Sequence, residues 1–242
     1  GPAHPGRGRR KLMDTTDGTL LGGRVPYRQP ATGYRTGIEP VLLAAHCPAK
    51  PGQCVLEVGC GAGAGLLCLL HRVPGVLAGG VEIDPAMAAL ARHNTGLPIH
   101  AADLMHFAPG TLYDHAMANP PWHDPMSTAP DASRALAKQA APALLAQWLA
   151  AIARLLRPRG TVTIVIPTAQ LTRAAAALRD TGFAAAALTP LWPRAGHPAK
   201  LMLLRATKGA RGPDQLMPGL VLHDGTGFTP AAQAILRDGH VL

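Results

Sequence analysis

Short apolar runs alternate with segments of helical pattern along most of this chain, and no other feature limits the fold as strongly. Strands that alternate with helices form a parallel sheet covered by helices. The predicted strands are Cys54–Val58, Val76–Ile83, Ile99–Ala101, His115–Ala118, Thr161–Ile166, Phe183–Thr189 and Lys200–Ala206. No helical pattern separates the last two, so we expect that pair to be antiparallel. The sequence therefore predicts an α/β fold with a doubly wound, mostly parallel, seven-stranded Rossmann-like sheet.

The helical patterns and the two ends of the chain suggest one large domain with additions on both sides. The predicted helices are Ile38–His46, Leu66–His71, Pro85–Asn94, Ala132–Leu156, Ala169–Asp180 and Pro230–Leu236. We expect a disordered basic arm at residues 1–13, a cover segment of short strands or turns at 14–50 and a core at 51–207. In residues 208–242, we expect the strand candidate Leu220–His223 and the last helix to pack on the core.

The balance of charge favours an anionic partner. Lys and Arg number 23 against 14 Asp and Glu, which gives a net charge of +9 and an isoelectric point near 10.0. Nucleic acid or an anionic membrane surface fits such a chain, although a solvated basic surface has the same composition. No apolar run reaches the roughly 18 residues that a membrane span needs. The four cysteines show no CxxC spacing and the eleven histidines are scattered, so we expect no metal site and a reducing, cytoplasmic environment.

A glycine-rich loop joins the first strand of the core to its first helix. Gly59, Gly61 and Gly63 follow the strand directly, and glycines let a ligand approach the backbone closely. The amides of such a loop and the helix N-terminus face the carboxyl end of the sheet, where α/β proteins bind ligands. Glu82 ends the next predicted strand, 19 positions after Gly63, and a carboxylate there is suited to bind both hydroxyls of a ribose. The loop therefore predicts a nucleoside-containing cofactor.

Two cofactors fit the glycine spacing. Gly59-x-Gly61-x-x-Ala64 matches the dinucleotide fingerprint, which would make the chain an oxidoreductase. Gly59-x-Gly61-x-Gly63 with Glu57 before it resembles instead the first motif of S-adenosylmethionine-dependent methyltransferases. A carboxylate at Glu57 suits the cationic methionine part of that cofactor and repels a pyrophosphate. The loop residues expected around S-adenosylmethionine are Glu57, Gly59, Cys60, Gly61 and Gly63.

The run Asn119-Pro120-Pro121-Trp122 follows the fourth predicted strand, at the edge of the sheet where ligands bind. Two consecutive prolines end the strand and fix the backbone. The Asn119 amide oxygen and the Pro120 carbonyl are then two fixed acceptors, and Trp122 is a flat platform beside them. Each acceptor can take one N–H bond from a planar amine, which aims the nitrogen lone pair at a methyl donor. A proline-stiffened loop with a packed tryptophan is the alternative without a ligand.

Amino-methyltransferases that act on adenine N6, guanine N2 or protein glutamine share this Asn-Pro-Pro-aromatic motif. Beyond it, the sequence resembles the bacterial family that methylates adenine N6 next to the anticodon of valine tRNA. The likeness lies in Asp17–Gly23, Gly33–Leu43, the glycine loop, Asn119–Pro125 and Leu220–Asp224, and so covers nearly the whole chain after the first 16 residues. It implies a class I methyltransferase fold and S-adenosylmethionine as the cofactor. The family usually has Tyr or Phe where this chain has Trp122.

The resemblance also implies roles for single residues. Glu82 would bind the cofactor ribose, with Ile83 beside it. Asp103 would accept a hydrogen bond from the cofactor adenine and the Leu104 amide would donate one, although an Asp at a strand end also caps helices. Asn119 would touch both the cofactor and the target base. The residues implied at the methionine end of the cofactor are Arg35, Thr36 and Gly37.

Basic side chains outside these motifs are candidates for contacts to RNA phosphates, which depend on salt and carry little sequence information. They are Arg7, Arg9, Arg10, Lys11, Arg28, Arg194 and Lys200. The first four form the basic arm, for which a solubilising tail is the alternative. The last two belong to a predicted loop, Leu191–Lys200, that also carries Trp192.

The sequence as a whole predicts an enzyme that transfers a methyl group from S-adenosylmethionine to an exocyclic amine of RNA, with adenine N6 of a tRNA near the anticodon as the favoured target. An rRNA guanine-N2 or a protein glutamine-N5 methyltransferase would use the same Asn-Pro-Pro motif. A non-catalytic RNA-binding protein on the same fold is a further alternative. The expected partner is RNA rather than a membrane, and a monomer is favoured.

Overall fold

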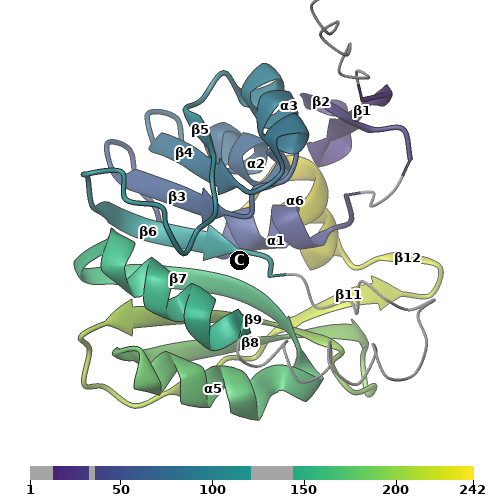
Figure 1. Ribbon diagram of the computed structural model, residues 1–242. Helices are drawn as coiled ribbons and strands as arrows, with labels where there is room; N and C mark the ends of the chain where they lie inside the picture. Colours follow the sequence, from purple (N-terminus) through teal and green to yellow (C-terminus); the bar gives the residue numbers. More distant parts are fainter. Residues whose placement is uncertain (1–12, 33–35, 121–143) are drawn as a thin grey trace, which may run out of the picture.

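The computed structural model describes residues 13–32, 36–120 and 144–242 (Figure 1). Its strands are β1 Thr15–Leu20, β2 Val25–Pro30, β3 Cys54–Val58, β4 Leu77–Glu82, β5 Ile99–Ala101, β6 Tyr113–Ala118, β7 Leu156–Pro167, β8 Phe183–Arg194, β9 Leu201–Lys208, β10 Gln215–Leu216, β11 Leu220–Asp224 and β12 Gly227–Phe228. Its helices are η1 Leu21–Gly23, α1 Glu39–His46, α2 Ala64–Arg72, α3 Pro85–Thr95, η2 Thr168–Gln170, α5 Leu171–Asp180 and α6 Pro230–Asp238, with a further helix over residues 144–155. Within the described ranges, no helix combines the length and apolar character that crossing a membrane requires.

A mixed sheet in the order β12-β11-β8-β9-β7-β6-β3-β4-β5 forms the centre of the molecule. Strands β3, β4, β5, β6 and β7 are parallel, whereas β9 is antiparallel to both β7 and β8. Helices α1, α2, α3 and α6 pack on one face, and α5 and the helix over residues 144–155 pack on the other (Figure 1). The predicted α/β fold, with a mostly parallel sheet and an antiparallel last pair, is confirmed.

Strand β3 shows how the sequence dictates the layers. Successive side chains of a strand point to opposite faces, so Val55 packs in the cluster under α1 and α2 while Leu56 packs under the helix over residues 144–155. Both are fully buried. A strand that is covered on both faces has a continuous apolar sequence. This is why Cys54–Val58 has the bounds that the sequence predicts.

The sheet has ten strands in the described part of the chain, not the predicted seven, because β10, β11 and β12 extend it beyond β8. The C-terminal strand therefore joins the sheet edge: β11 runs parallel to β8 and pairs Leu220 with Leu191 and His223 with Arg194. Because of this pairing, β8 extends to Arg194 instead of ending at Thr189 as predicted. The first part of the predicted loop Leu191–Lys200 is therefore strand. Likewise, β7 begins at Leu156 rather than Thr161.

Strands β1 and β2 form a separate antiparallel hairpin, which accounts for the short strands expected near the N-terminus. Its turn, η1, is fixed to α6 by Arg24. The guanidinium of Arg24 donates to the Asp238 carboxylate at 2.7 Å and to the Arg237 carbonyl. The hairpin thereby lies against the helices on one side of the sheet (Figure 1).

Candidate active site

A cavity of about 880 Å³ lies at the carboxyl edge of the sheet, where β3, β4, β6 and β7 end. Most of the described residues that the sequence singles out line this one cavity. They are Thr36, Glu57, Gly59, Cys60, Gly61, Glu82, Ile83, Asp103, Leu104, Asn119 and Pro120. Gly37 and Gly63 are not part of its wall, although Gly63 precedes α2 as its N-cap. Arg35, Pro121, Trp122 and the arm residues Arg7, Arg9, Arg10 and Lys11 lie outside the described residues.

The glycine loop wraps around the end of β4. Gly59 has φ 66° and its N–H donates to the Val81 carbonyl at 2.8 Å. The Gly61 N–H donates to one oxygen of Glu82 at 2.8 Å, and the Asp84 N–H donates to the other at 2.9 Å. A carboxylate oxygen can accept two hydrogen bonds, so each Glu82 oxygen retains capacity for a ligand hydroxyl.

Glu57 is a carboxyl group buried behind the loop, with 4% of its surface exposed. Its Oε2 accepts the Leu66 N–H at 3.0 Å, and a Cβ at Gly65 would collide with its Oε1. Burial raises the pKa of Glu57 to about 8, because the Leu66 N–H offsets the loss of water only in part and the Glu82 carboxylate adds to the increase. The sequence predicts the position of this carboxylate but not its affinity for a proton.

A second carboxylate, Glu39, lines the same cavity from the start of α1. Its Oε2 is buried and has no hydrogen-bond partner among the described residues. An unpaired buried oxygen of this kind is costly unless a ligand or ion satisfies it. Because both Glu39 and Glu57 line the cavity, it is suitable for a cationic group such as the methionine part of S-adenosylmethionine.

Another part of the cavity wall carries Asp103 and apolar side chains. Asp103 Oδ1 accepts the Met105 N–H at 3.0 Å, and Oδ2 lies 3.0 Å from the His106 ring. These two contacts lower the pKa of Asp103. They also stabilise the turn after β5, which is the capping role that the sequence left open for this residue. Ile83 is 69% exposed although it is apolar, and it lies in the cavity wall with Leu104. An exposed isoleucine beside a carboxylate fits a flat heterocycle that has a polar edge.

Asn119 and Pro120 come directly after β6, between the ends of β3 and β7. Asn119 is half-buried, Pro120 is buried, and both line the cavity. Trp148, from the helix over residues 144–155, lies across the loop: its Cη2 would be 2.9 Å from a Cβ at Gly59. Sequence reasoning missed Trp148, because nothing in an Ala-rich helix indicates that this side chain reaches a loop 89 positions earlier.

The N-terminal hairpin closes one side of the cavity. The Tyr27 hydroxyl lies 2.7 Å from Thr36 Oγ1, and both residues are in the wall. Tyr27 is 5% exposed and is also absent from the sequence prediction. The general composition of this segment indicated a cover but not which of its side chains lines the cavity.

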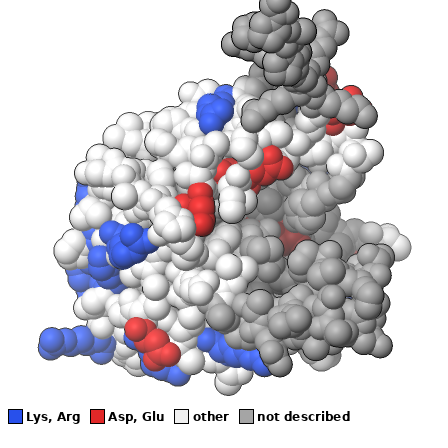
Figure 2. Space-filling model, viewed as in Figure 1, with Lys and Arg blue, Asp and Glu red and all other residues white. Residues whose placement is uncertain are grey.

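Among the described residues, the basic side chains predicted to contact RNA lie in two separate places. Arg28 belongs to β2 and pairs with Asp17 at 2.7 Å, which partly neutralises its charge. Arg194 ends β8, where it donates to the Gly225 carbonyl at 3.3 Å, and Lys200 precedes β9. On the face in Figure 2, Lys and Arg lie mainly toward the left and lower margins, with one group near the top, and Asp and Glu are scattered among uncharged residues.

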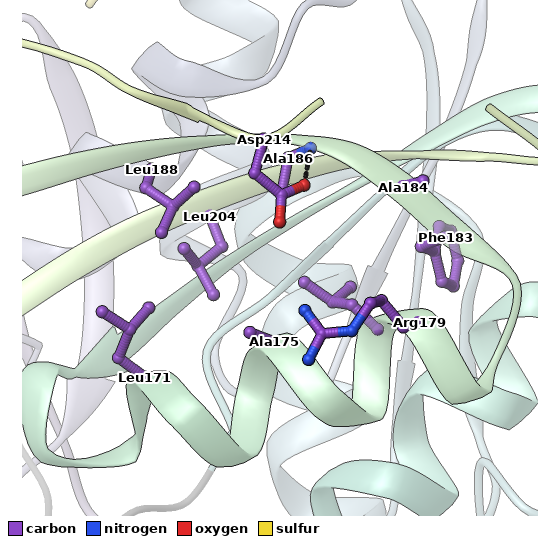
Figure 3. A pocket seen from close by; sticks show the side chains of 10 residues that line it. Leu171, Ala175, Arg179, Phe183, Ala184, Ala186, Leu188, Leu204 and Asp214 are labelled. Carbon is purple, nitrogen blue, oxygen red and sulfur yellow. Dashed lines mark hydrogen bonds between the residues drawn. The ribbon is translucent and has the colours of Figure 1, made fainter. Parts of the chain in front are cut away.

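A second, much smaller cavity of about 20 Å³ lies between α5 and β8 (Figure 3). Its wall is mainly apolar, and Asp214 accepts the Ala186 N–H there at 2.9 Å. Such a volume holds about one water molecule at most. The large cavity is therefore the candidate active site.

Comparison with known proteins agrees with this geometry. Residues 38–181 match the family model described as the methyltransferase small domain. The tRNA1(Val) (adenine(37)-N6)-methyltransferase of Aeromonas hydrophila subsp. hydrophila is 31% identical over 200 residues, which cover 80% of this chain and 84% of that relative. The enzyme of the same name from Serratia proteamaculans is 33% identical over 55% of each chain. A predicted O-methyltransferase from Agrobacterium tumefaciens has a crystal structure with a TM-score of 0.69, at 20% identity, over 84% of this chain and 97% of that one, a likeness of fold.

Proposed function

Because the chain belongs to the methyltransferase small domain family and is an S-adenosylmethionine-dependent methyltransferase, we propose that it methylates N6 of an adenine in tRNA, next to the anticodon. The observation that carries the proposal is the position of Asn119 and Pro120 in the same cavity wall as the glycine loop and Glu82. The Aeromonas relative, of which the chain covers 84%, is named for adenine 37 of a valine tRNA.

Side chains at the carboxyl edge of the sheet and at the start of α1 are proposed to hold the cofactor, which supplies a methyl group on a positively charged sulfur. Glu82 binds the ribose hydroxyls with the lone pairs that its two backbone bonds leave over. Asp103 binds the amino group of the cofactor adenine, and Ile83 packs against the ring. Glu39 stabilises the cationic methionine end together with Glu57, which that positive charge shifts toward its ionised form, and Thr36 lies in the same cavity wall. The buried Glu39 oxygen, which has no hydrogen-bond partner among the described residues, would meet a pyrophosphate unfavourably, and this argues against a dinucleotide.

Asn119 and Pro120 are proposed to position the target amine. The Asn119 side-chain oxygen and the Pro120 carbonyl each accept one N–H bond, which turns the nitrogen lone pair toward the methyl group. The same two dipoles stabilise the positive charge that develops on the nitrogen. The methylated nitrogen then releases a proton to water, so the site needs no strong general base.

The adenine must leave its stack to enter the cavity, and bases in a tRNA loop are already partly unstacked. Arg194 and Lys200, at the same carboxyl edge of the sheet, are proposed to hold flanking phosphates. The four cysteines are free, and we expect the enzyme to work in the cytoplasm, where tRNA is modified and thiols stay reduced.

Replacing Asn119 by Ala tests the proposed chemistry. Binding of S-adenosylhomocysteine, measured by calorimetry, should change by less than about threefold, while turnover on tRNA should fall by roughly 100-fold or more because one of two acceptors is lost. Gln215→Ala, which removes an exposed amide on β10, is the matched control and should affect neither quantity. Equal loss of cofactor binding and turnover in Asn119→Ala would show a structural role for Asn119 and overturn the mechanism.

A further inference from the structure

One side chain joins the N-terminal hairpin to the glycine loop. Asn94 lies in the last turn of α3, and its Nδ2 donates to the Arg28 carbonyl at 2.7 Å and to the Ala62 carbonyl at 2.8 Å. Its Oδ1 accepts the Arg28 N–H at 3.2 Å. Both amide hydrogens and the amide oxygen are therefore engaged, with β2 on one side and the loop on the other.

The same junction has an apolar part. Tyr27, Ala62, Ala64 and Leu90 form a small buried cluster of their own, with Met87 packed against it. Four of these five residues line the large cavity, the exception being Leu90. The surface that Asn94 holds together is thus a wall of the cofactor site.

The hairpin lines the cavity only while β2 stays in place against the glycine loop. Tyr27 reaches the wall from β2, one residue before the Arg28 backbone that Asn94 holds. Through its hydroxyl, Tyr27 also contacts Thr36, which leads to α1 and Glu39. A shift of β2 relative to the loop would therefore move two parts of the wall together.

From these contacts we propose that Asn94 is a positioning residue for cofactor binding, and that it couples the β1–β2 hairpin to the glycine loop. The inference rests on the proposed placement of S-adenosylmethionine in this cavity but not on the identity of the methyl acceptor. When the bound cofactor reduces the motion of the loop at Ala62, the hydrogen bonds of Asn94 also reduce the motion of β2. When Asn94 is removed, the apolar cluster of Tyr27, Ala62 and Ala64 still connects the hairpin to the loop, but the coupling between them is weaker.

The hairpin has a second anchor that provides a matched control. Arg24 holds η1 to α6 through Asp238 and the Arg237 carbonyl, and it makes no bond to the glycine loop. Removing either Asn94 or Arg24 should lower the Tm, because each variant loses hydrogen bonds between the hairpin and a helix. Only the loss of Asn94 should also weaken the binding of the cofactor.

The test compares wild type, Asn94→Ala, Asn94→Asp and Arg24→Ala by calorimetry with S-adenosylhomocysteine and by hydrogen exchange. Asn94→Asp keeps an acceptor for the Arg28 N–H but cannot donate to either carbonyl, and it also covers the case in which Asn94→Ala does not fold. We expect both Asn94 variants to bind about tenfold more weakly and Arg24→Ala to bind as wild type does. S-adenosylhomocysteine should slow exchange at residues 15–30 in wild type and Arg24→Ala but not in the Asn94 variants.

The outcomes separate the two proposals. A wild-type chain that does not bind S-adenosylhomocysteine would overturn the cofactor placement itself. If wild type binds S-adenosylhomocysteine, the cofactor placement stands. If Asn94→Ala and Arg24→Ala then change the affinity and the exchange at residues 15–30 to the same extent, the role of Asn94 is overturned. In steady-state assays, the role predicts a raised KM for S-adenosylmethionine with kcat changed less than about twofold, whereas a general loss of folded enzyme would lower kcat alone.

Discussion

Replacing Glu57 by Gln should change how the stability of the protein depends on pH. Burial raises the pKa of this carboxyl to about 8 in the folded chain, from an ordinary value of 4.5. Between these two pH values the folded state retains a proton that the unfolded state has released. The free energy of unfolding therefore falls as pH rises through this window, and the contribution of Glu57 is fully present only below it.

The magnitude follows from the width of the window. Each pH unit within it changes the free energy of unfolding by about 1.4 kcal/mol. From about pH 5.5 to about pH 7.5, wild type should lose up to roughly 3 kcal/mol relative to Glu57→Gln, whose amide does not titrate. For a chain of this length that is a difference in Tm on the order of 5–10 °C. Gln keeps an oxygen that can accept the Leu66 N–H, which Glu57 binds at 3.0 Å.

Differential scanning calorimetry of both proteins, at several pH values and one ionic strength, measures this difference. Other titrating groups, such as the buried His46, are common to both proteins and cancel in the comparison. Parallel Tm curves for the two proteins, measured without cofactor, would refute the argument that Glu57 retains a proton in the folded chain. Saturating S-adenosylmethionine should narrow the gap, because its positive charges favour the ionised carboxylate.

Three further changes test other parts of the site. Gly59→Ala should weaken S-adenosylhomocysteine binding by at least about tenfold in calorimetry, because Gly59 has φ 66° and a Cβ would lie 2.9 Å from Trp148. Unchanged affinity would show that the loop tolerates a side chain. Ile83→Ser should weaken the same binding severalfold, since an apolar side chain that is 69% exposed would be covered by the cofactor adenine; an equal affinity would place the adenine elsewhere. Arg194→Ala combined with Lys200→Ala should weaken tRNA binding and reduce its salt slope by about two without affecting the cofactor, and an unaltered slope would remove both residues from the RNA surface.

Local sequence signals predicted the elements around the site well. Strand β3 ends where Gly59 begins the loop, and α3 begins at Pro85 after Asp84, whose side chain accepts the Ala86 N–H at 2.8 Å. The same helix ends before Gly96, which has φ 68°. Glycine, proline and capping residues act through their own backbone and their nearest neighbours, so their effect can be seen in a short stretch of sequence.

Features that depend on distant partners were not predictable. Strand β8 continues past Pro190 to Arg194 because β11 pairs with it, and that partner comes later in the chain. Trp148 and Asn94 reach the glycine loop from helices whose sequences show only ordinary amphipathic patterns. The raised pKa of Glu57 is a consequence of complete burial, which only the packed structure shows.

The most direct test of the proposed function is methyl transfer from labelled S-adenosylmethionine to bulk tRNA, total rRNA and a protein extract in parallel, followed by mass spectrometry of the nucleosides and of hydrolysed protein. The account predicts N6-methyladenosine in the tRNA, and Asn119→Ala should abolish that signal. Label found as N2-methylguanosine in rRNA, or as methylglutamine in protein, would contradict the proposed substrate. No label in any of the three, from a protein that binds S-adenosylhomocysteine, would contradict the proposed choice of acceptors altogether.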